Sequence, residues 1–355
     1  MPDPPRRKPP AAAGRVFLWP MAASSSPDLT LYDPFERMQL VAPACFLCGT
    51  PVDPAHQHVT VFAPWLMQRY GLADKEIRLL DQSTTTFREL TIPCCEQCQQ
   101  HVAAVEARVE AATAADPAGL RQLDDQTLFL WLGKMFYGIF VNELARELEP
   151  LIKPRYPLAE NRSLFSRFRS FFQVLQGLRV PMQFDDFTPG SVFILDVNVG
   201  PEGPAFAYDD DLATMVFSLR LGNVAIISCL LDNDMLRHVM QRVYDDARTR
   251  PLHPIQLAEF KARVYYGAYL ISAIPEYFPR AVKPGDEVLV MDTFLDDVTG
   301  SVFNPWDNMA YAQTLEELWL PWKIELRTIL ADPREPMSYL YDDAGQPRTI
   351  TTFPA

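Results

Sequence analysis

Two short cysteine motifs, CFLCG at residues 45–49 and CCEQC at residues 94–98, decide the fold of the first third of this chain. Each motif contains a CxxC pair, and one tight turn can present both thiolates to the same ion. Two such turns can complete a tetrahedron around Zn²⁺, with Zn–S distances of about 2.3 Å. Gly49 suits the positive φ that such a turn often requires. We therefore predict a structural zinc site formed by Cys45, Cys48, Cys95 and Cys98.

The second motif contains an additional cysteine, which leaves its register open. Cys94 and Cys98 also have a spacing that could bind the metal, although the pattern Pro93-x-Cys95 favours Cys95 and Cys98. The distance between the motifs exceeds the roughly 15–20 residues of a plain zinc ribbon, so a sizeable segment must be inserted between them. The alternative to a metal site is four buried free thiols. This alternative is less favoured, because two CxxC pairs are not expected by chance.

The composition limits the class of protein. The chain has 355 residues, of which 48% are hydrophobic and 22% are charged, as in ordinary globular proteins. This length suggests two domains. The net charge is −13, from 45 acidic and 32 basic residues. A surface this acidic repels phosphate backbones, so any contact with nucleic acid must come from a local basic patch.

The first 30 residues (1–30) are predicted to form a disordered tail, and Met21 is an alternative start codon to Met1. The segment RVFLWPMAASSS at 15–26 has only a short apolar run, which Pro20 interrupts, whereas a signal peptide needs about 7–15 apolar residues. The cysteines are also too sparse for a secreted disulfide scaffold. We therefore expect a cytoplasmic protein in which the CxxC pairs bind metal.

Helical periodicity follows the second motif. Residues 101–115 are predicted to form a helix, and residues 124–148 a buried helix that Asp124 caps. The most apolar stretch, residues 128–141, contains Lys134. Because it is shorter than the roughly 18–20 apolar residues of a membrane span, we expect no membrane segment.

From residue 190 the pattern changes to β-branched and partly alternating residues. The strands are expected at 191–199, 213–221, 223–231 and 286–294, amphipathic or buried helices at 233–247 and 254–274, and a terminal β-hairpin at 338–353. The acidic run Asp209–Asp211 is interpreted as a solvated turn rather than a Mg²⁺ site. The second half therefore has a mixed α+β pattern.

The cysteine motifs lie within a longer pattern that resembles a known family. CFLCG is followed by His58, by Trp65-Leu66, and by IPCCEQCQQ (92–100) with a helix after it. This order is similar to that of bacterial HNH-type endonuclease-like proteins, in which the CxxC pairs hold a structural zinc that staples a ββα-metal fold. WLGKMFYGIF (131–140) also resembles the Trp-x-x-Lys helix that often follows in that family. The resemblance covers about residues 42–142.

The resemblance implies hydrolysis of a nucleic-acid phosphodiester. That reaction needs a base to activate water, a divalent metal to neutralise charge and a group to orient the base. By the family pattern His58 would be the base, a preceding carboxylate would help hold the metal, and an Asn after the last cysteine would orient the imidazole. Gln57 and Gln99 stand at those two positions, and a neutral amide is a weak ligand for a hard divalent cation. His56 and His101 are candidate replacement ligands for a second metal.

One stretch of the chain is both basic and aromatic. In residues 153–179, Arg162, Arg167 and Arg169 alternate with phenylalanines, and the stretch contains a single acidic residue, Glu160. This pattern occurs on surfaces that bind phosphates and stack bases. The alternative, which we favour, is an amphipathic helix whose phenylalanines enter the core and whose arginines reach solvent. If the protein binds DNA or RNA, we expect the contact here.

These observations predict an α+β protein with a small HNH-like (ββα-metal) zinc module at 40–115 and a larger mixed α/β domain at 120–355. Two functions remain open. One is a metal-dependent nucleic-acid phosphodiesterase of HNH type, and the other is a non-enzymatic structural or interaction protein whose zinc staples the fold. The net charge and the two glutamines favour the second function. The CxxC pairs are consistent with either function.

Overall fold

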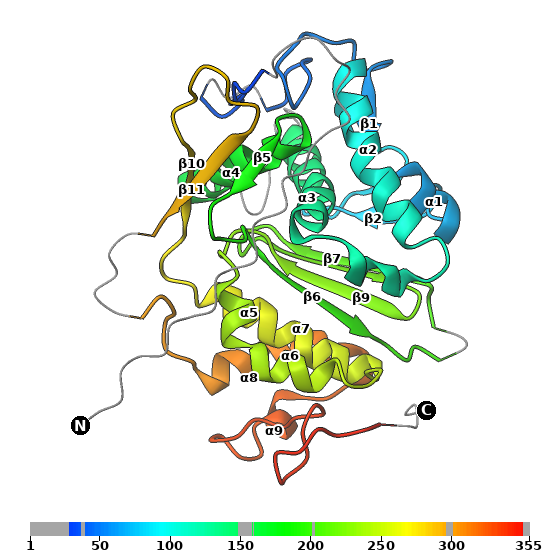
Figure 1. The fold of residues 1–355 in the computed structure, drawn as a ribbon. Coiled ribbons are helices and arrows are strands. Elements are labelled where there is room, and N and C mark those ends of the chain that lie inside the picture. The colour runs from blue at the N-terminus through cyan, green and yellow to red at the C-terminus, as the bar shows by residue number, and fades with distance from the viewer. Residues whose placement is uncertain are drawn as a thin grey trace, which may run out of the picture.

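The computed structural model describes residues 28–36, 40–147, 158, 160–200, 203–295 and 301–350. The predicted tail lies outside these residues except for 28–30. There Leu29 is buried, and Thr30 accepts a hydrogen bond from Arg179, so these three residues contact the body of the protein. Helices surround several sheets in an α+β fold, which confirms the predicted fold class (Figure 1).

A four-stranded antiparallel sheet in the order β6-β9-β8-β7 forms the middle of the molecule. Its strands are β6 (Ser191–Asp196), β7 (Phe206–Asp211), β8 (Val216–Leu221) and β9 (Val224–Cys229). The sequence predicted β6, β8 and β9. The interpretation of Asp209–Asp211 as a turn was wrong, because these residues pair with β8 and complete β7, from Phe206 opposite Leu221 to Asp211 opposite Val216.

Helices cover both faces of this sheet (Figure 1). On one face, side chains such as Ile194 and Phe217 pack with α3 (Asp125–Glu147) and α4 (Arg162–Leu175). On the other face, Phe193 and Ile227 pack with α5 (Met235–Val239), α6 (Gln241–Ala247) and α7 (Pro254–Tyr269). Because successive strand residues point to opposite faces, continuous apolar strands such as β9 are buried on both sides.

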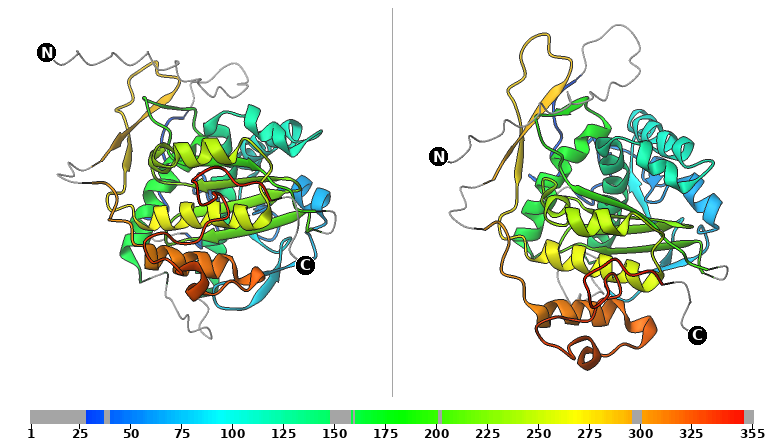
Figure 2. Two further views of the ribbon diagram at one scale, coloured as in Figure 1. Left: turned by 90° about the horizontal axis from the view of Figure 1, so that it is seen from below. Right: turned by 60° about the horizontal axis from the view of Figure 1, so that its bottom comes forward.

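The C-terminal part adds a further layer beyond α7. This layer consists of helices α8 (Asn308–Leu318), η3 (Leu320–Trp322) and α9 (Leu326–Ile329) (Figure 2). Its apolar residues pack around Trp319, whose indole N–H donates to the carbonyl of Ile255 at 3.1 Å. A separate sheet has the order β10-β11-β5, with β5 at Met182–Phe184, β10 at Glu276–Pro279 and β11 at Leu289–Phe294. In this sheet β5 and β11 run parallel.

Among the described residues, the predicted terminal hairpin at 338–353 is confirmed only in its turn, where the Arg348 N–H donates to the Leu340 carbonyl at 2.8 Å and the Asp342 N–H donates to the Gln346 carbonyl at 2.9 Å. Only one antiparallel bridge forms there, between Tyr341 and Pro347. The buried carboxylate of Glu259 on α7 accepts the backbone N–H groups of Tyr339 and Leu340 at 2.6 and 2.9 Å. The backbone N–H groups of Tyr339 and Leu340 are therefore bound by a helix side chain and are not available to a partner strand.

The segment that carries the cysteine motifs contains two strands and a helix. β1 (His58–Thr60) pairs antiparallel with β4 (Thr91–Pro93), and α2 (Glu96–Ala112) follows β4 directly. The elements inserted between β1 and β4 are α1 (Pro64–Tyr70), β2 (Glu76–Arg78) and β3 (Thr84–Thr86). Two short helices follow later in the chain, η1 (Pro117–Gln122) after α2 and η2 (Gln176–Leu178) after α4. A continuous hydrophobic core joins this segment to α3, α4 and the sheet. The division into residues 40–115 and 120–355 stays a prediction.

The helix α3 is the core helix of the protein. Within the described residues it is the one helix long and apolar enough, by length and composition, to cross a membrane, but 89% of its most apolar window is buried inside the protein. The apolar stretch at 128–141 is short, as the sequence indicates, and the helix of 23 residues extends beyond it at both ends.

A buried ammonium group joins β1, α2 and α3. Lys134 is 2% exposed and donates to the carbonyls of Thr60 and Val61 at 2.7 and 2.9 Å, and to the carboxylate of Glu106 on α2 at 2.5 Å. Gly138, one turn further along α3, allows the close approach, because a Cβ there would lie 2.6 Å from a methyl group of Val61. All three donors of the ammonium group thus have partners.

We expect Lys134→Met to destabilise the protein by about 3–5 kcal/mol, because it leaves the Glu106 carboxylate and two carbonyl groups buried without a donor. Denaturant unfolding measures this loss. Lys283→Met, at an exposed lysine, is the matched control and should change stability little. Equal stability of the two variants would show that the buried pair does not hold these elements together.

Candidate metal centre

The first cysteine pair lies in a tight turn. An antiparallel bridge between Ala44 and Pro51 closes the base of the turn, and the Gly49 N–H donates to the Cys45 carbonyl at 2.8 Å. Gly49 has φ of +73°, and a Cβ at this position would lie 2.5 Å from the ring of Tyr32. Only glycine fits both the left-handed backbone and the packed ring.

The second pair lies where β4 passes into α2. Cys95 occupies the N-cap position of the helix without a side-chain capping hydrogen bond, and Cys98 is in the first turn, where the aligned peptide dipoles favour a thiolate. The two turns are joined by the Phe46 N–H, which donates to the Pro93 carbonyl at 2.9 Å. Backbone pairing therefore brings the two distant motifs to the same place.

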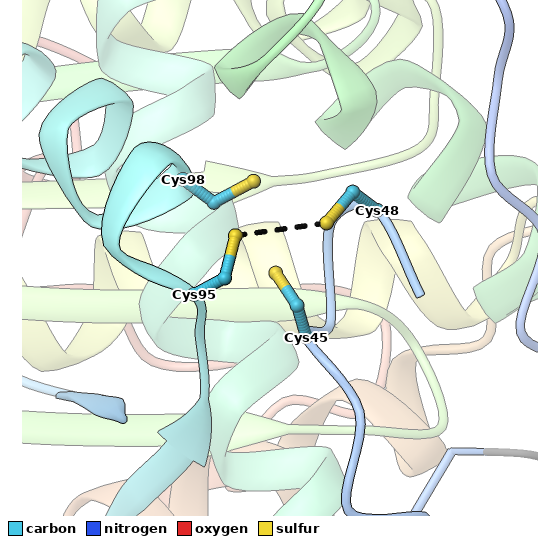
Figure 3. A group of neighbouring side chains, drawn as sticks. All are labelled: Cys45, Cys48, Cys95 and Cys98. Atoms are coloured by element: carbon cyan, nitrogen blue, oxygen red, sulfur yellow. Dashed lines mark hydrogen bonds between the residues drawn. The ribbon is translucent and has the colours of Figure 1, made fainter. Parts of the chain in front are cut away.

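The four sulfur atoms converge. The Sγ atoms of Cys45, Cys48, Cys95 and Cys98 all lie within 4.8 Å of one another, and those of Cys48 and Cys95 are 3.7 Å apart (Figure 3). A ZnS₄ tetrahedron with bonds of about 2.3 Å has S···S edges of about 3.8 Å. A disulfide would need about 2.05 Å, and all four cysteines are free thiols. This group could hold a metal ion.

The electrostatics of the cluster also fit a cation. The pKa of the Cys45 thiol is lowered, because Cys94 and Cys98 donate hydrogen bonds to its sulfur. The pKa of the Cys98 thiol is raised by its hydrogen bond to Cys45 and by burial. Four thiolates this close would repel one another strongly, and a central divalent ion removes that repulsion. Soft sulfur ligands alone suit Zn²⁺ far better than Mg²⁺ or Ca²⁺.

The structure also decides between the two registers of the second motif. Cys95, not Cys94, belongs to the group of four. Cys94 is buried beside it and helps to lower the pKa of Cys45. Its backbone N–H donates to the Gln57 carbonyl at 2.9 Å, so Cys94 is held by the strand that leads into the turn.

The predicted catalytic and second-metal histidines lie near these turns but do not converge. His58 is half-buried on β1 and donates through Nδ1–H to the Pro54 carbonyl at 2.9 Å, while His56 is exposed and contacts Asp53 at 2.8 Å. His101 is half-buried on α2, where burial and the charge of Arg179 lower its pKa. Across the described ranges, the cysteine cluster is the one group of His, Cys, Asp or Glu residues whose ligand atoms converge. The roles of His56, His58 and His101 stay predictions.

The two glutamines at the expected catalytic positions contact the backbone. The Gln57 side-chain oxygen accepts the Asp53 N–H at 3.2 Å. The Gln99 amide donates to the Cys94 carbonyl at 2.8 Å. Both side chains thus stabilise the turns that lead to the cysteines.

Residues 153–157 and 159 of the basic stretch lie outside the described residues, while Arg162–Leu175 form the amphipathic helix α4. Its Phe168, Phe171 and Phe172 are buried in the core, as the favoured interpretation predicted. The predicted nucleic-acid contacts differ in their surroundings. Arg162 is exposed, whereas Arg167 donates to the Ala213 carbonyl at 2.5 Å and Arg169 pairs with Asp33 at 2.6 Å.

No protein-family model matches this chain, and no match was found among curated proteins or solved structures. The likeness to HNH-type proteins therefore rests on the motif residues. The sequence left Cys94 open as an alternative ligand, because spacing alone does not show which thiol of the double cysteine at 94–95 joins the group of four.

We expect Cys95→Ser to abolish binding of one metal ion and Cys94→Ser to preserve it, because only Cys95 contributes a converging sulfur. Metal content per purified chain, measured by inductively coupled plasma mass spectrometry, distinguishes the two variants. Retention by Cys95→Ser together with loss in Cys94→Ser would assign the site to the other register.

Proposed function

We propose that this protein is a non-enzymatic zinc-binding protein in which one structural Zn²⁺ staples an HNH-like module. The convergence of the four Sγ atoms within 4.8 Å carries the proposal. Two thiolates would come from the turn at 45–48 and two from the start of α2, so the ion would close the long segment between them. Closing such a loop stabilises the folded state by restricting the unfolded chain.

The surroundings of the catalytic positions favour a structural role over a hydrolytic one. Gln57 and Gln99 are used in backbone contacts, and neither supplies a carboxylate to a second metal. Arg167 and Arg169, two of the three arginines considered for phosphate binding, bind groups of the protein itself. The net charge of −13 further opposes nucleic-acid binding.

We expect the purified chain to contain one Zn²⁺ and to lose stability when a chelator removes it. The melting temperature should fall by roughly 5 °C or more, since 1 kcal/mol corresponds to about 2–4 °C in a large domain. Cys98→Ser should reproduce the effect, whereas Cys229→Ser, in β9, should keep the ion. A chain that holds no metal and melts at the same temperature with and without chelator would refute the staple.

A second candidate function is a metal-dependent phosphodiesterase of HNH type. Its support is the order of β1, β4 and α2, with His58 opposite Pro93 just before the second cysteine motif. The Nδ1–H of His58 donates to a carbonyl, which leaves Nε2 as the basic nitrogen.

A plasmid-nicking assay with Mg²⁺, Mn²⁺ or Ni²⁺ separates the two functions. The proposed structural role predicts no metal-dependent cleavage by the wild type. The phosphodiesterase would instead be established if the wild type cleaves the plasmid, His58→Ala does not, and the control His238→Ala on α5 still does.

A further inference from the structure

A cavity of about 960 Å³ lies between the segment inserted after the first cysteine motif and the edge strand of the central sheet. Its lining comes from β2 and neighbouring residues, from β7, and from residues of α3 and α4. Most of the lining is apolar, including Ile77, Phe87 and Phe206. Small-molecule sites in proteins commonly have this size and character, with a few polar groups that orient the ligand.

Two carboxyl groups, Glu143 on α3 and Asp210 on β7, face this cavity. Glu143 is 7% exposed, and one of its oxygens accepts the Leu80 N–H at 3.0 Å. Within the part of the chain that the structure describes, Glu143 has no other hydrogen bond, and neither carboxyl group has an ion-pair partner. A buried carboxylate without a counter-ion is costly, and a cationic ligand would relieve that cost.

The neighbouring acidic residues are already used within the protein. Asp209 pairs with Lys261 and accepts a hydrogen bond from Tyr265 at 3.3 Å. Asp211 accepts the Ala213 N–H and the Thr214 hydroxyl, which closes the turn after β7. Asp210 accepts a hydrogen bond from Tyr208. The remaining acidic lining residue, Glu76, is exposed, so Glu143 and Asp210 are the more buried carboxyl groups left for a ligand.

We propose that this cavity binds an organic cation, an ammonium group attached to an apolar body. The ammonium group would lie between Glu143 and Asp210, and the apolar body would contact the walls formed by Ile77, Phe87 and Phe206. A metal ion is a poorer fit, because the oxygens of these carboxyl groups do not belong to any converging ligand group among the described residues. A phosphate-bearing ligand is disfavoured, because the charged residues of the lining are five acidic ones against two basic ones, Lys75 and Arg78.

The titration of the two carboxyl groups makes the proposal pH-dependent. Burial raises the pKa of Glu143 to about 7, as do Asp210 and Asp81, while the Leu80 N–H and Arg146 act in the opposite direction. Burial also raises the pKa of Asp210 to about 7, as do Asp209 and Asp211. Tyr208 and Lys261 oppose this shift. Both groups are thus largely neutral at about pH 6 and charged at about pH 8.

The test compares three probes of one shape: 4-phenylbutylamine, 4-phenylbutanol and 4-phenylbutyrate. Isothermal titration calorimetry with the full chain at about pH 8 should show the amine binding about tenfold more tightly than the alcohol, and the carboxylate binding least. Amine affinity should fall about tenfold at about pH 6, where the alkylammonium keeps its charge but the carboxyl groups gain protons. Alcohol affinity should not change.

Variants assign the effect to the two carboxyl groups. Glu143→Gln and Asp210→Asn should each weaken amine binding about tenfold and leave alcohol binding unchanged. Glu110→Gln, at an exposed position on α2, is the matched control and should bind like the wild type. Glu143→Gln should also be folded and more stable than wild type above about pH 7, because ionisation of a carboxyl group with a raised pKa opposes folding.

Three results would overturn the proposal. They are equal affinity for amine and alcohol at about pH 8, preference for the carboxylate, or amine binding that neither variant weakens. The comparison of probes and pH values needs only the wild-type chain, so it decides the question even if a variant fails to fold. Zinc content is measured on the same samples. It tests the proposed structural zinc site independently of the proposed binding of an organic cation.

Discussion

The buried ammonium group of Lys134 connects the segment that carries the cysteine cluster to the rest of the protein. It contacts the end of β1, the carboxylate of Glu106 on α2 and, through its own backbone, the core helix α3. Removing an ammonium group from water is unfavourable unless every donor finds a partner, and here all three do. These partners exist only when β1, α2 and α3 have come together. The position of the second cysteine pair, at the start of α2, depends on the same arrangement.

The four thiols impose a second constraint on the same elements. Their sulfur atoms can meet only if the turn at 45–48 stays against β4, and the hydrogen bond from Phe46 to Pro93 holds it there. The two constraints act at different places, because Lys134 fixes the far end of β1 while the cysteines fix the start of α2. The residues between them, including Gln57 and Gln99, support the backbone. This distribution of contacts supports the proposed structural role of the segment.

The sequence predicted the features that depend on local pattern. The two CxxC pairs identified the sulfur cluster, and helical periodicity identified α3 and the buried face of α4. It failed where tertiary contacts override local preference. Three aspartates suggested a turn, but pairing with β8 makes them part of β7, since their side chains find partners such as Lys261. The cavity could not be predicted either, because Glu143 and Asp210 come from elements far apart in the chain and neither lies in a motif.

The long spacing between the cysteine motifs also has a structural explanation. The inserted segment supplies one wall of the cavity through residues such as Ile77 and Phe87, while β7, at the edge of the sheet, supplies the other. In a plain zinc ribbon the two CxxC turns are too close in sequence for an inserted segment of this length. An ion bound at the cysteines would hold both ends of the inserted segment, and so would restrict the position of that wall relative to Glu143 on α3. The proposed structural ion and the proposed organic ligand would therefore use different groups of the same fold, the cysteine sulfurs for the ion and the carboxyl groups of the cavity for the ligand.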